Sequence, residues 1–199
     1  MLDLFLVRHS ITYGNTLGRY IGKRTDEPLT KDGIALLKRR YYPQVQTVFT
    51  SPLKRCVQTA ALCYPDTPVH TLEELAECDF GEFENKNYKE LSGNDKYQEW
   101  IDSNGTLPFP GGESREAFME RCQRGFSRCV EYCLREGLHS GALVVHGGTI
   151  MSILDAYAVP HQGYYDWQVG NGGGYQVRTS AVVWNERVQE LHVVKKLAE

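Results

Sequence analysis

Two residue pairs, Arg8-His9 and His146-Gly147, each follow directly on a short apolar segment. Residues 4–7 and 142–145 are continuous apolar runs with β-branched members, which is typical of strands buried on both faces. Parallel strands of an open α/β sheet present ligand-binding groups at their carboxyl ends. An arginine there can hold an anionic group, and an imidazole can attack that group or give it a proton. The residues alone leave open a second interpretation, in which Arg8 and His9 only terminate an exposed strand.

A third basic residue, Arg55, is predicted near the start of a helix that begins at Ser51-Pro52. Ser51 suits the N-cap position and Pro52 the first helical position. The backbone N–H groups and positive dipole at a helix N-terminus favour anions, and an adjacent arginine would strengthen such a site. A solvated arginine on the helix surface is the alternative.

A run of acids between residues 73 and 84 surrounds two aromatic residues, Phe80 and Phe83. A carboxyl group beside either ring would be partly desolvated, which raises its pKa. A general acid that works near neutral pH needs such a raised pKa. Acidic runs are more commonly solvated faces, and the sequence does not select one acid among Glu77, Glu82 and Glu84.

The elements that must position these groups alternate between strand and helix. We expect short strands at residues 46–50 and 69–72, and a C-terminal β-hairpin at 175–184 and 188–194. Helices are expected at residues 31–41, 51–63, 113–135, with Ser114 as N-cap, and 150–157. Residues 87–102 are expected to form one or two short helices. With the Pro- and Gly-containing loop at 103–112, they predict a cap over the sheet.

Composition excludes several classes of protein. The 199 residues are 41% hydrophobic and 24% charged, with a formal net charge of -3, as expected of one globular domain. The absence of a basic stripe argues against nucleic acid as a partner. No apolar run is long enough to span a membrane, and the N-terminus does not resemble a signal peptide, so we expect a cytoplasmic protein.

The six cysteines predict buried thiols. Cys122, Cys129 and Cys133 are spaced to share one helix face, where free thiols pack as small apolar groups. A zinc site needs two close ligand pairs, and only Cys129 and Cys133 form a near pair. We therefore expect no metal.

Four motifs occur in an order that is typical of one family. They are Leu6-Val7-Arg8-His9-Ser10-Ile11-Thr12, Ser51-Pro52-Leu53-Lys54-Arg55-Cys56-Val57-Gln58-Thr59-Ala60, Phe80-Gly81-Glu82-Phe83-Glu84-Asn85 and Val144-Val145-His146-Gly147-Gly148. Together they resemble the histidine phosphatase superfamily, in its phosphoglycerate-mutase-like branch. Each motif alone is weak, but the four together are specific and cover most of the chain.

The resemblance implies a covalent mechanism. His9 would attack phosphorus and become phosphohistidine, His146 would act beside it, and Glu77, three residues before Phe80-Gly81, would be the proton donor. The phosphate-binding residues that it implies are Arg8, Asn15, Arg55 and Gly147. Phosphoryl transfer needs positioning and charge stabilisation above all, which arginines and imidazoles can supply. No cofactor and no metal are therefore expected.

The resemblance also implies the fold and the reaction. We expect one domain, residues 1–199, with a three-layer α/β/α architecture, a mostly parallel central sheet and a small helical cap insertion at about residues 80–112. The short chain favours a phosphatase acting on a small phosphorylated metabolite over a mutase, and a non-catalytic phosphate-binding module is the third alternative. Segments 20–30 and 110–114 resemble the bacterial α-ribazole phosphatase group, which makes α-ribazole 5′-phosphate a candidate substrate.

Some residues depart from the family pattern. Ser10 replaces a glycine, Ile11 a polar residue, Ala76 an arginine and Asn85 a glycine. None of these removes a catalytic group, so they bear on substrate identity more than on activity. The sequence leaves the oligomeric state and the pathway undetermined.

Overall fold

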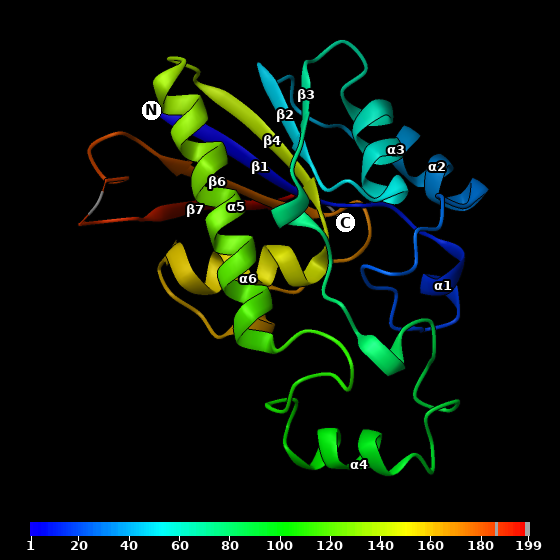
Figure 1. The fold of residues 1–199 in the computed structure, drawn as a ribbon. Coiled ribbons are helices and arrows are strands. Elements are labelled where there is room, and N and C mark those ends of the chain that lie inside the picture. Colours follow the sequence, from blue (N-terminus) through cyan, green and yellow to red (C-terminus); the bar gives the residue numbers. More distant parts are fainter. Residues whose placement is uncertain (186, 198–199) are drawn as a thin grey trace.

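A seven-stranded sheet forms the centre of the computed structural model, which describes residues 1–185 and 187–197 (Figure 1). The strands are β1 (Leu2–Arg8), β2 (Thr47–Thr50), β3 (Val69–Thr71), β4 (Ser140–Val145), β5 (Ala158–Val159), β6 (Gly174–Thr179) and β7 (Leu191–Leu197). Their order across the sheet is β3-β2-β4-β1-β6-β7-β5. Strands β1, β2, β3 and β4 pair in parallel, as do β5 and β7, whereas β6 is antiparallel to β1 and β7. The mostly parallel sheet that the sequence predicts is confirmed.

Helices cover both faces of this sheet. They are α1 (Tyr13–Thr16), α2 (Lys31–Lys38), α3 (Lys54–Cys63), α4 (Asp95–Asp102), α5 (Arg115–Arg135) and α6 (Gly147–Tyr157), with 3-10 turns η1 (Glu73–Leu75), η2 (Gly81–Phe83) and η3 (Tyr164–Trp167). In Figure 1, α5 and α6 lie on one side of the sheet and α2 and α3 on the other. This three-layer arrangement confirms the predicted fold class.

Strand β1 contributes to two separate hydrophobic cores because successive side chains of a strand point to opposite faces. Leu2, Leu4 and Leu6 are fully buried in one core, together with residues of α5 and α6. Phe5 and Val7 belong to the other core, together with residues of β2 and α3. The apolar run at the N-terminus is therefore buried on both faces, as predicted.

The start of α3 differs from the prediction. The helix begins at Lys54, and its N-cap residue is Leu53, so the assignment of Ser51 as N-cap is wrong. Ser51 continues the extended path of β2, where its N–H donates to the carbonyl of Val144 at 3.2 Å. Its hydroxyl lies 2.8 Å from Nε2 of His146, which explains why this serine does not cap the helix.

Other boundaries shift by a few residues. Helix α2 ends at Lys38, and α6 begins at Gly147, so that His146 occupies its N-cap position. Ser114 caps α5 as predicted, through a bond from the N–H of Ala117. The short helix α1 was not predicted; it begins at a capping box between Thr12 and Asn15. The C-terminal strands pair as a hairpin but begin and end at different residues from those predicted, and residue 186 of their connection lies outside the described residues.

The expected cap consists of η2, α4 and the loops around them, which extend below the sheet in Figure 1. Its interior is aromatic: the ring of Phe83, fully buried, packs edge to face against Tyr97, Trp100 and Phe109. Backbone hydrogen bonds join the two ends of the cap, from Glu82 to Pro110 (2.8 Å) and from Glu113 to Asp79 (2.9 Å). The cap is therefore closed at its base, and within residues 87–102 it holds one α-helix.

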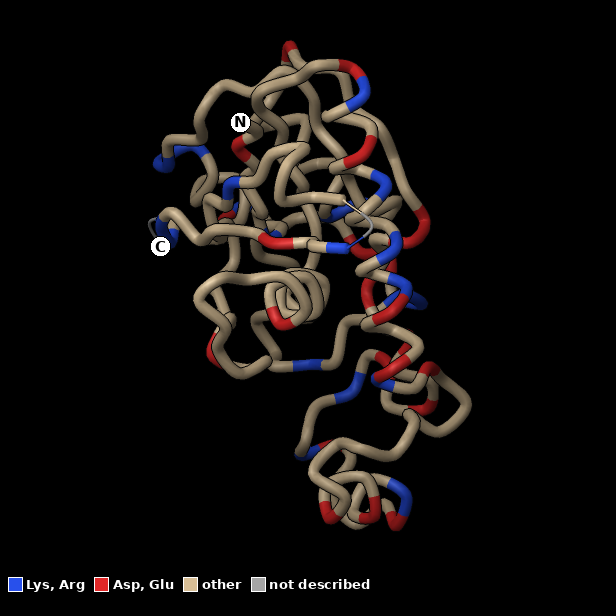
Figure 2. The backbone as a smooth tube through the Cα atoms, turned by 90° about the vertical axis from the view of Figure 1, so that its left-hand side faces the viewer, with Lys and Arg blue, Asp and Glu red and all other residues tan. Residues whose placement is uncertain are grey.

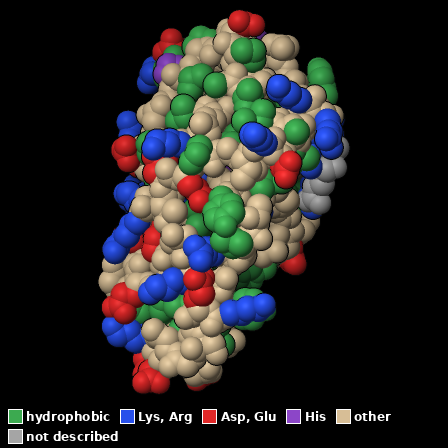
Figure 3. Space-filling view, turned by 90° about the vertical axis from the view of Figure 1, so that its right-hand side faces the viewer, with side chains coloured by type: hydrophobic (Ala, Val, Ile, Leu, Met, Phe, Trp, Pro, Cys, Tyr) green, Lys and Arg blue, Asp and Glu red, His purple; other side chains and the backbone are tan. Residues whose placement is uncertain are grey.

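The surface carries both signs of charge. Figure 3 shows acidic and basic side chains interspersed over the side of the molecule where α2 and α3 lie. Among the described residues, no helix combines the length and the apolar character that crossing a membrane requires.

Candidate active site

The carboxyl ends of β1 and β4 bring two histidines together. The strands pair in parallel with Arg8 opposite Val145, and the N–H of His9 donates to the carbonyl of Val145 at 2.9 Å. His9 and His146, the residues that follow the two strands, therefore lie side by side. Their ring centroids are 5.2 Å apart, in an edge-to-face arrangement.

The ring of His9 is oriented by the neighbouring backbone. Its Nδ1 lies 2.7 Å from the carbonyl oxygen of Ser10. Because a carbonyl can only accept, Nδ1 carries the proton in the neutral ring, and Nε2 has the free electron pair. Burial, followed by the charges of Arg55 and Arg8, lowers the pKa of His9 well below its ordinary value. The imidazole is thus neutral at neutral pH, with Nε2 available as a nucleophile.

His146 is fully buried and also neutral. Its Nε2 lies 2.8 Å from the Ser51 hydroxyl and 3.5 Å from the sulfur of Cys56. Burial is the largest cause that lowers its pKa, followed by the charge of Arg55. Nothing in the sequence indicated that Ser51 and Cys56 contact this ring.

Two arginines supply positive charge to the same place. Arg55 is fully buried, and its terminal nitrogens donate to backbone carbonyls of the loop at residues 21–25, at 2.8–3.2 Å. Arg8 donates through Nη1 to the carbonyl of Val169 at 2.7 Å. In the described part of the chain, the buried Nε of each guanidinium has no hydrogen-bond partner, and neither arginine forms an ion pair within 4.0 Å. Cations withdrawn from solvent and held by neutral carbonyls, with no carboxylate at ion-pair distance, favour an anionic ligand.

Glu77 is the buried carboxylate of this region. Its Oε1 accepts from the N–H of Cys78 at 3.0 Å. Burial raises its pKa, and the bond from Cys78 and the charges of Arg55 and Arg8 oppose that shift. The group therefore tends to hold a proton to a higher pH than an exposed glutamate.

The first turn of α6 lies close to both kinds of group, and its approach to Glu77 requires the glycine at position 148. A Cβ at Gly147 would lie 3.5 Å from Nε of Arg8, and a Cβ at Gly148 would lie 2.8 Å from Oε1 of Glu77. The N-terminus of α6, with its free N–H groups, is thus placed against the predicted phosphate-binding and acid residues.

The other two candidate acids have structural partners. Glu82 is exposed and forms an ion pair with Lys96 at 2.7 Å. Glu84 accepts backbone N–H bonds from Gly22, Thr25 and Phe80. Of the three acids that the sequence left open, only Glu77 is buried beside the arginines.

Arg121, on α5, holds the segment that carries Glu77, and the sequence did not point to it. Its guanidinium donates to the carbonyls of Glu74, Ala76 and Glu77 at 2.9–3.3 Å. Two further bonds of 2.8 Å join it to the carboxylate of Glu113. Arg121 lies on the side of α5 that carries the apolar stripe, close to Phe118 and Cys122 in sequence. A charged residue at such a position is the signal that could have identified it.

Asn171, in the glycine-rich stretch before β6, is a second residue to which the sequence did not point. Its amide lies within 3.3 Å of the carbonyls of His9 and Ser10 and 3.2 Å from Oδ1 of Asn15. The same Oδ1 accepts from the N–H of Thr12 at 3.1 Å. The orientation of the predicted phosphate ligand Asn15 is therefore fixed by two donors.

Two cavities adjoin this cluster, and Tyr20 lines both. One, of about 270 Å³, contains Glu77 and Gly148 and is walled by aromatic rings, among them Phe80, Trp100 and Tyr164. The other, of about 370 Å³, is more polar and contains Arg8, Asn15 and Asn171. All the predicted site residues thus lie in or beside one region under the cap.

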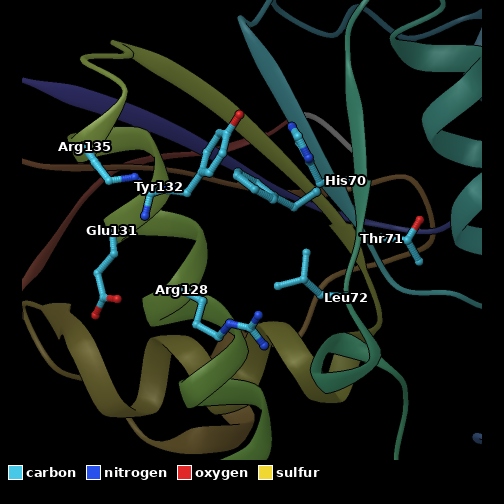
Figure 4. Close-up of a pocket in the computed structure, with 8 residues that line it drawn as sticks. His70, Thr71, Leu72, Arg128, Glu131, Tyr132 and Arg135 are labelled. Carbon is cyan, nitrogen blue, oxygen red and sulfur yellow. The ribbon is translucent and has the colours of Figure 1, made fainter.

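A separate cavity lies between β3 and α5 (Figure 4). The rings of His70 and Tyr132, which both line it, are in contact with centroids 4.9 Å apart, and Arg128 lies at its lower end. None of its lining residues is a predicted site residue.

The chain has named relatives. The family model of the histidine phosphatase superfamily, branch 1, matches residues 4–190. The adenosylcobalamin/alpha-ribazole phosphatase of Salmonella typhimurium is 33% identical over 164 residues, which is 78% of each chain. This chain belongs to the histidine phosphatase superfamily. The predicted class of enzyme, a phosphatase, is thereby confirmed.

Solved structures of this superfamily agree in fold. The alpha-ribazole phosphatase from Shigella flexneri has a TM-score of 0.80 at 25% identity, over 100% of this chain and 96% of that one. The phosphoglycerate mutase from Thermus thermophilus has a TM-score of 0.71 at 30% identity, over 100% of this chain and 99% of that one. Both a phosphatase and a mutase are therefore among the similar structures.

The neutral state of the two histidine rings can be tested by titration. We expect NMR signals of the His9 and His146 rings to titrate below the ordinary histidine pKa of about 6.5. Arg55→Met should raise both midpoints, because it removes the charge that is the second cause of each shift. Midpoints at or above about 6.5 in the wild type would contradict the buried, neutral state.

Proposed function

We propose that this chain is a cofactor-independent phosphatase that hydrolyses a small phosphomonoester through a phosphohistidine at His9. The observation that carries the proposal is the Nε2 electron pair of His9, held near the fully buried Arg55 and the part-buried Arg8, neither of which has a carboxylate within 4.0 Å in the described part of the chain. A dianionic phosphoryl group would neutralise those charges. The residues that bind it would be Arg8, Asn15, Arg55, His146 and Gly147.

In the first half of the reaction, Nε2 of His9 attacks phosphorus. The bond from phosphorus to the leaving oxygen breaks, and Glu77 gives that oxygen its proton, so that the alcohol leaves neutral. The arginines balance the charge on the equatorial oxygens, which is the main requirement of phosphoryl transfer. The raised pKa of Glu77 suits this donor role near neutral pH.

In the second half, water attacks the phosphohistidine. The Glu77 carboxylate, which has lost its proton, accepts one from the water as the new P–O bond forms. The bond from phosphorus to Nε2 breaks, and phosphate leaves. His9 returns to the neutral tautomer that the Ser10 carbonyl selects.

The cavity that contains Glu77 indicates the kind of leaving group. Because the acid must lie next to the leaving oxygen, the alcohol portion of the substrate would occupy this cavity. Its aromatic walls suit a planar apolar group. Together with the name of the Salmonella relative, this supports α-ribazole 5′-phosphate, an aromatic nucleotide, as the substrate.

The proposal also covers the domain organisation, the class of substrate and the cellular compartment. The chain would act as one domain on a small phosphorylated metabolite, in a bacterial cytoplasm. Its relatives above come from bacteria.

The nucleophile is tested by trapping the intermediate. We expect His9→Ala to abolish turnover, because no neighbouring group replaces Nε2. Brief reaction with a ³²P-labelled substrate should give an acid-labile, base-stable adduct on the wild-type protein only. An adduct that persists in His9→Ala would exclude this nucleophile, and a wild type without turnover or adduct would favour the non-catalytic binding module.

The proton donor is tested by the leaving group. Glu77→Gln should slow hydrolysis of an alkyl phosphate by about 10²–10⁴-fold and that of p-nitrophenyl phosphate much less, since nitrophenolate leaves without a proton. In the wild type, turnover of the alkyl phosphate should fall as the pH rises through the pKa of Glu77, because the donor loses its proton.

Glu82→Gln is the matched control for this experiment. This variant makes the same chemical change five residues away, at an exposed carboxylate. It should not appreciably change the rate of hydrolysis of either substrate. If Glu82→Gln showed the leaving-group dependence and Glu77→Gln did not, the assignment of the acid would be wrong.

The substrate is tested by competition between candidates. We expect a higher kcat/KM for α-ribazole 5′-phosphate than for 3-phosphoglycerate, with release of free phosphate. Trp100→Ala should raise KM for the aromatic substrate and leave that for glycerol phosphate nearly unchanged, because only the former reaches the aromatic wall. Transfer of phosphate between positions of phosphoglycerate would instead support the mutase.

A further inference from the structure

Arg115 supplies a positive charge to the cavity that contains Glu77. The wall of this cavity comes partly from the cap, which Figure 2 shows below the rest of the chain, and partly from α5, α6 and η3. Apart from Glu77, Arg115 is the one acidic or basic residue among the described residues that line it. No carboxylate of the described residues lies within 4.0 Å of its guanidinium, and its side chain has no hydrogen bond to them.

The stability of α5 does not explain an arginine at this position. Arg115 is the first residue of the helix, directly after the N-cap Ser114, whose hydroxyl accepts the N–H of Ala117 at 3.1 Å. Free N–H groups make a helix N-terminus positive, so a cation is less favourable there than a neutral or acidic residue. The contacts of the Arg115 side chain are instead with the wall of the cavity.

Two tyrosines of η3 hold the Arg115 guanidinium. Its central carbon lies 4.5 Å from the ring centroid of Tyr164 and 5.6 Å from that of Tyr165, and both rings line the same cavity. The negative face of an aromatic ring attracts a cation, so these contacts balance part of the charge. They leave the N–H donors of the guanidinium without an acceptor atom. The group therefore lacks a hydrogen-bond acceptor more than it lacks a counter-ion.

The rest of the wall favours a flat, uncharged ring. Phe109 packs against Phe80 and Trp100, with ring centroids 5.0 and 5.1 Å apart, and all three line the cavity. Such walls suit a planar apolar group, and they solvate a carboxylate poorly. A heteroaromatic ring with a bare nitrogen meets both demands. The ring packs on the aromatic walls, and the nitrogen accepts a charge-assisted hydrogen bond from Arg115.

We propose that Arg115 selects the leaving group, by donating to the bare ring nitrogen of a benzimidazole-type heterocycle. The inference rests on the proposed function, in which Glu77 protonates the leaving oxygen and the alcohol portion occupies this cavity. Arg115 contacts the ring and not the phosphoryl group, so the bond is made equally before and during phosphoryl transfer. Its loss should therefore raise KM and leave kcat nearly unchanged.

The test compares two substrates that differ in one ring atom. They are the 5′-phosphate of benzimidazole riboside, whose ring has a bare nitrogen, and that of indole riboside, in which a C–H group takes its place. We expect the wild type to prefer the benzimidazole ester by about tenfold or more in kcat/KM, because the indole leaves a charged donor unpaired. Arg115→Met keeps a long side chain without the donor. It should remove this preference by raising KM for the benzimidazole ester alone.

The matched control is Arg124→Met, which makes the same change on the same helix, at an exposed residue that does not line the cavity. This variant should retain the preference. Arg115→Met should hydrolyse glycerol phosphate, which has no ring, at nearly the wild-type rate, and this activity shows that the variant is folded. An Arg115→Met protein that still prefers the benzimidazole ester would overturn the inference. So would one that loses activity on phosphoserine, whose leaving group carries a carboxylate, and retains the preference between the two rings.

A binding measurement separates this inference from the proposed function. A wild type that hydrolyses none of these esters would contradict the phosphatase, but calorimetric titration with benzimidazole riboside and indole riboside needs no turnover. The wild type should bind the benzimidazole riboside more tightly, and Arg115→Met should bind the two equally. Equal affinities in the wild type, or no binding of either riboside, would overturn the role of Arg115 whether or not the protein is a phosphatase.

Discussion

Positive charge that is withdrawn from solvent, with no carboxylate of the described residues at ion-pair distance, is the constraint on which the rest of the site depends. Arg55 has no exposed surface, and its terminal nitrogens donate to carbonyls of the loop at residues 21–25. Arg8 is anchored in the same way, to Val169. Such cations are costly to bury, and the fold retains them by enclosing them in neutral dipoles. The charge is then available to a phosphoryl group.

The same burial sets the protonation of the groups around these arginines. Desolvation disfavours every charged form, so it lowers the pKa of His9 and raises that of Glu77. The nearby guanidinium groups reinforce the first shift and oppose the second. A neutral nucleophile and a protonated acid can therefore coexist at one pH, which the proposed first step requires.

Backbone contacts from remote side chains keep these groups in place. Arg121 binds three carbonyls of the segment that carries Glu77, Asn171 binds the carbonyls of His9 and Ser10, and Glu84 binds three N–H groups around the loop that holds Arg55. Most of these contacts join residues that are far apart in the sequence. These contacts hold the loop segments of the site in place. The proposed mechanism therefore does not need a metal ion to position them.

Local patterns in the sequence were enough to predict the two central strands, and four motifs resembled a known family, which in turn implied the fold class; the short strand β5 was not predicted. The apolar runs at residues 4–7 and 142–145 identify the two central strands, and the residues that follow them necessarily emerge at one edge of a parallel sheet. The acidic run, with its two aromatic residues, offered candidates for a desolvated carboxyl without selecting one among them. Segments whose polarity alternates less clearly, such as the C-terminal hairpin, were predicted with shifted boundaries.

Which polar groups meet depends on the tertiary structure. Ser51 has the local signature of an N-cap, but a contact with His146, 95 residues away, takes precedence over it. Glu77, Glu82 and Glu84 are similar as sequence, and they differ because packing buries one beside arginines, exposes another to Lys96 and surrounds the third with backbone N–H groups. Burial and long-range hydrogen bonding depend on the whole chain, so the residue types alone could not distinguish the three acids, and only the family resemblance singled out Glu77.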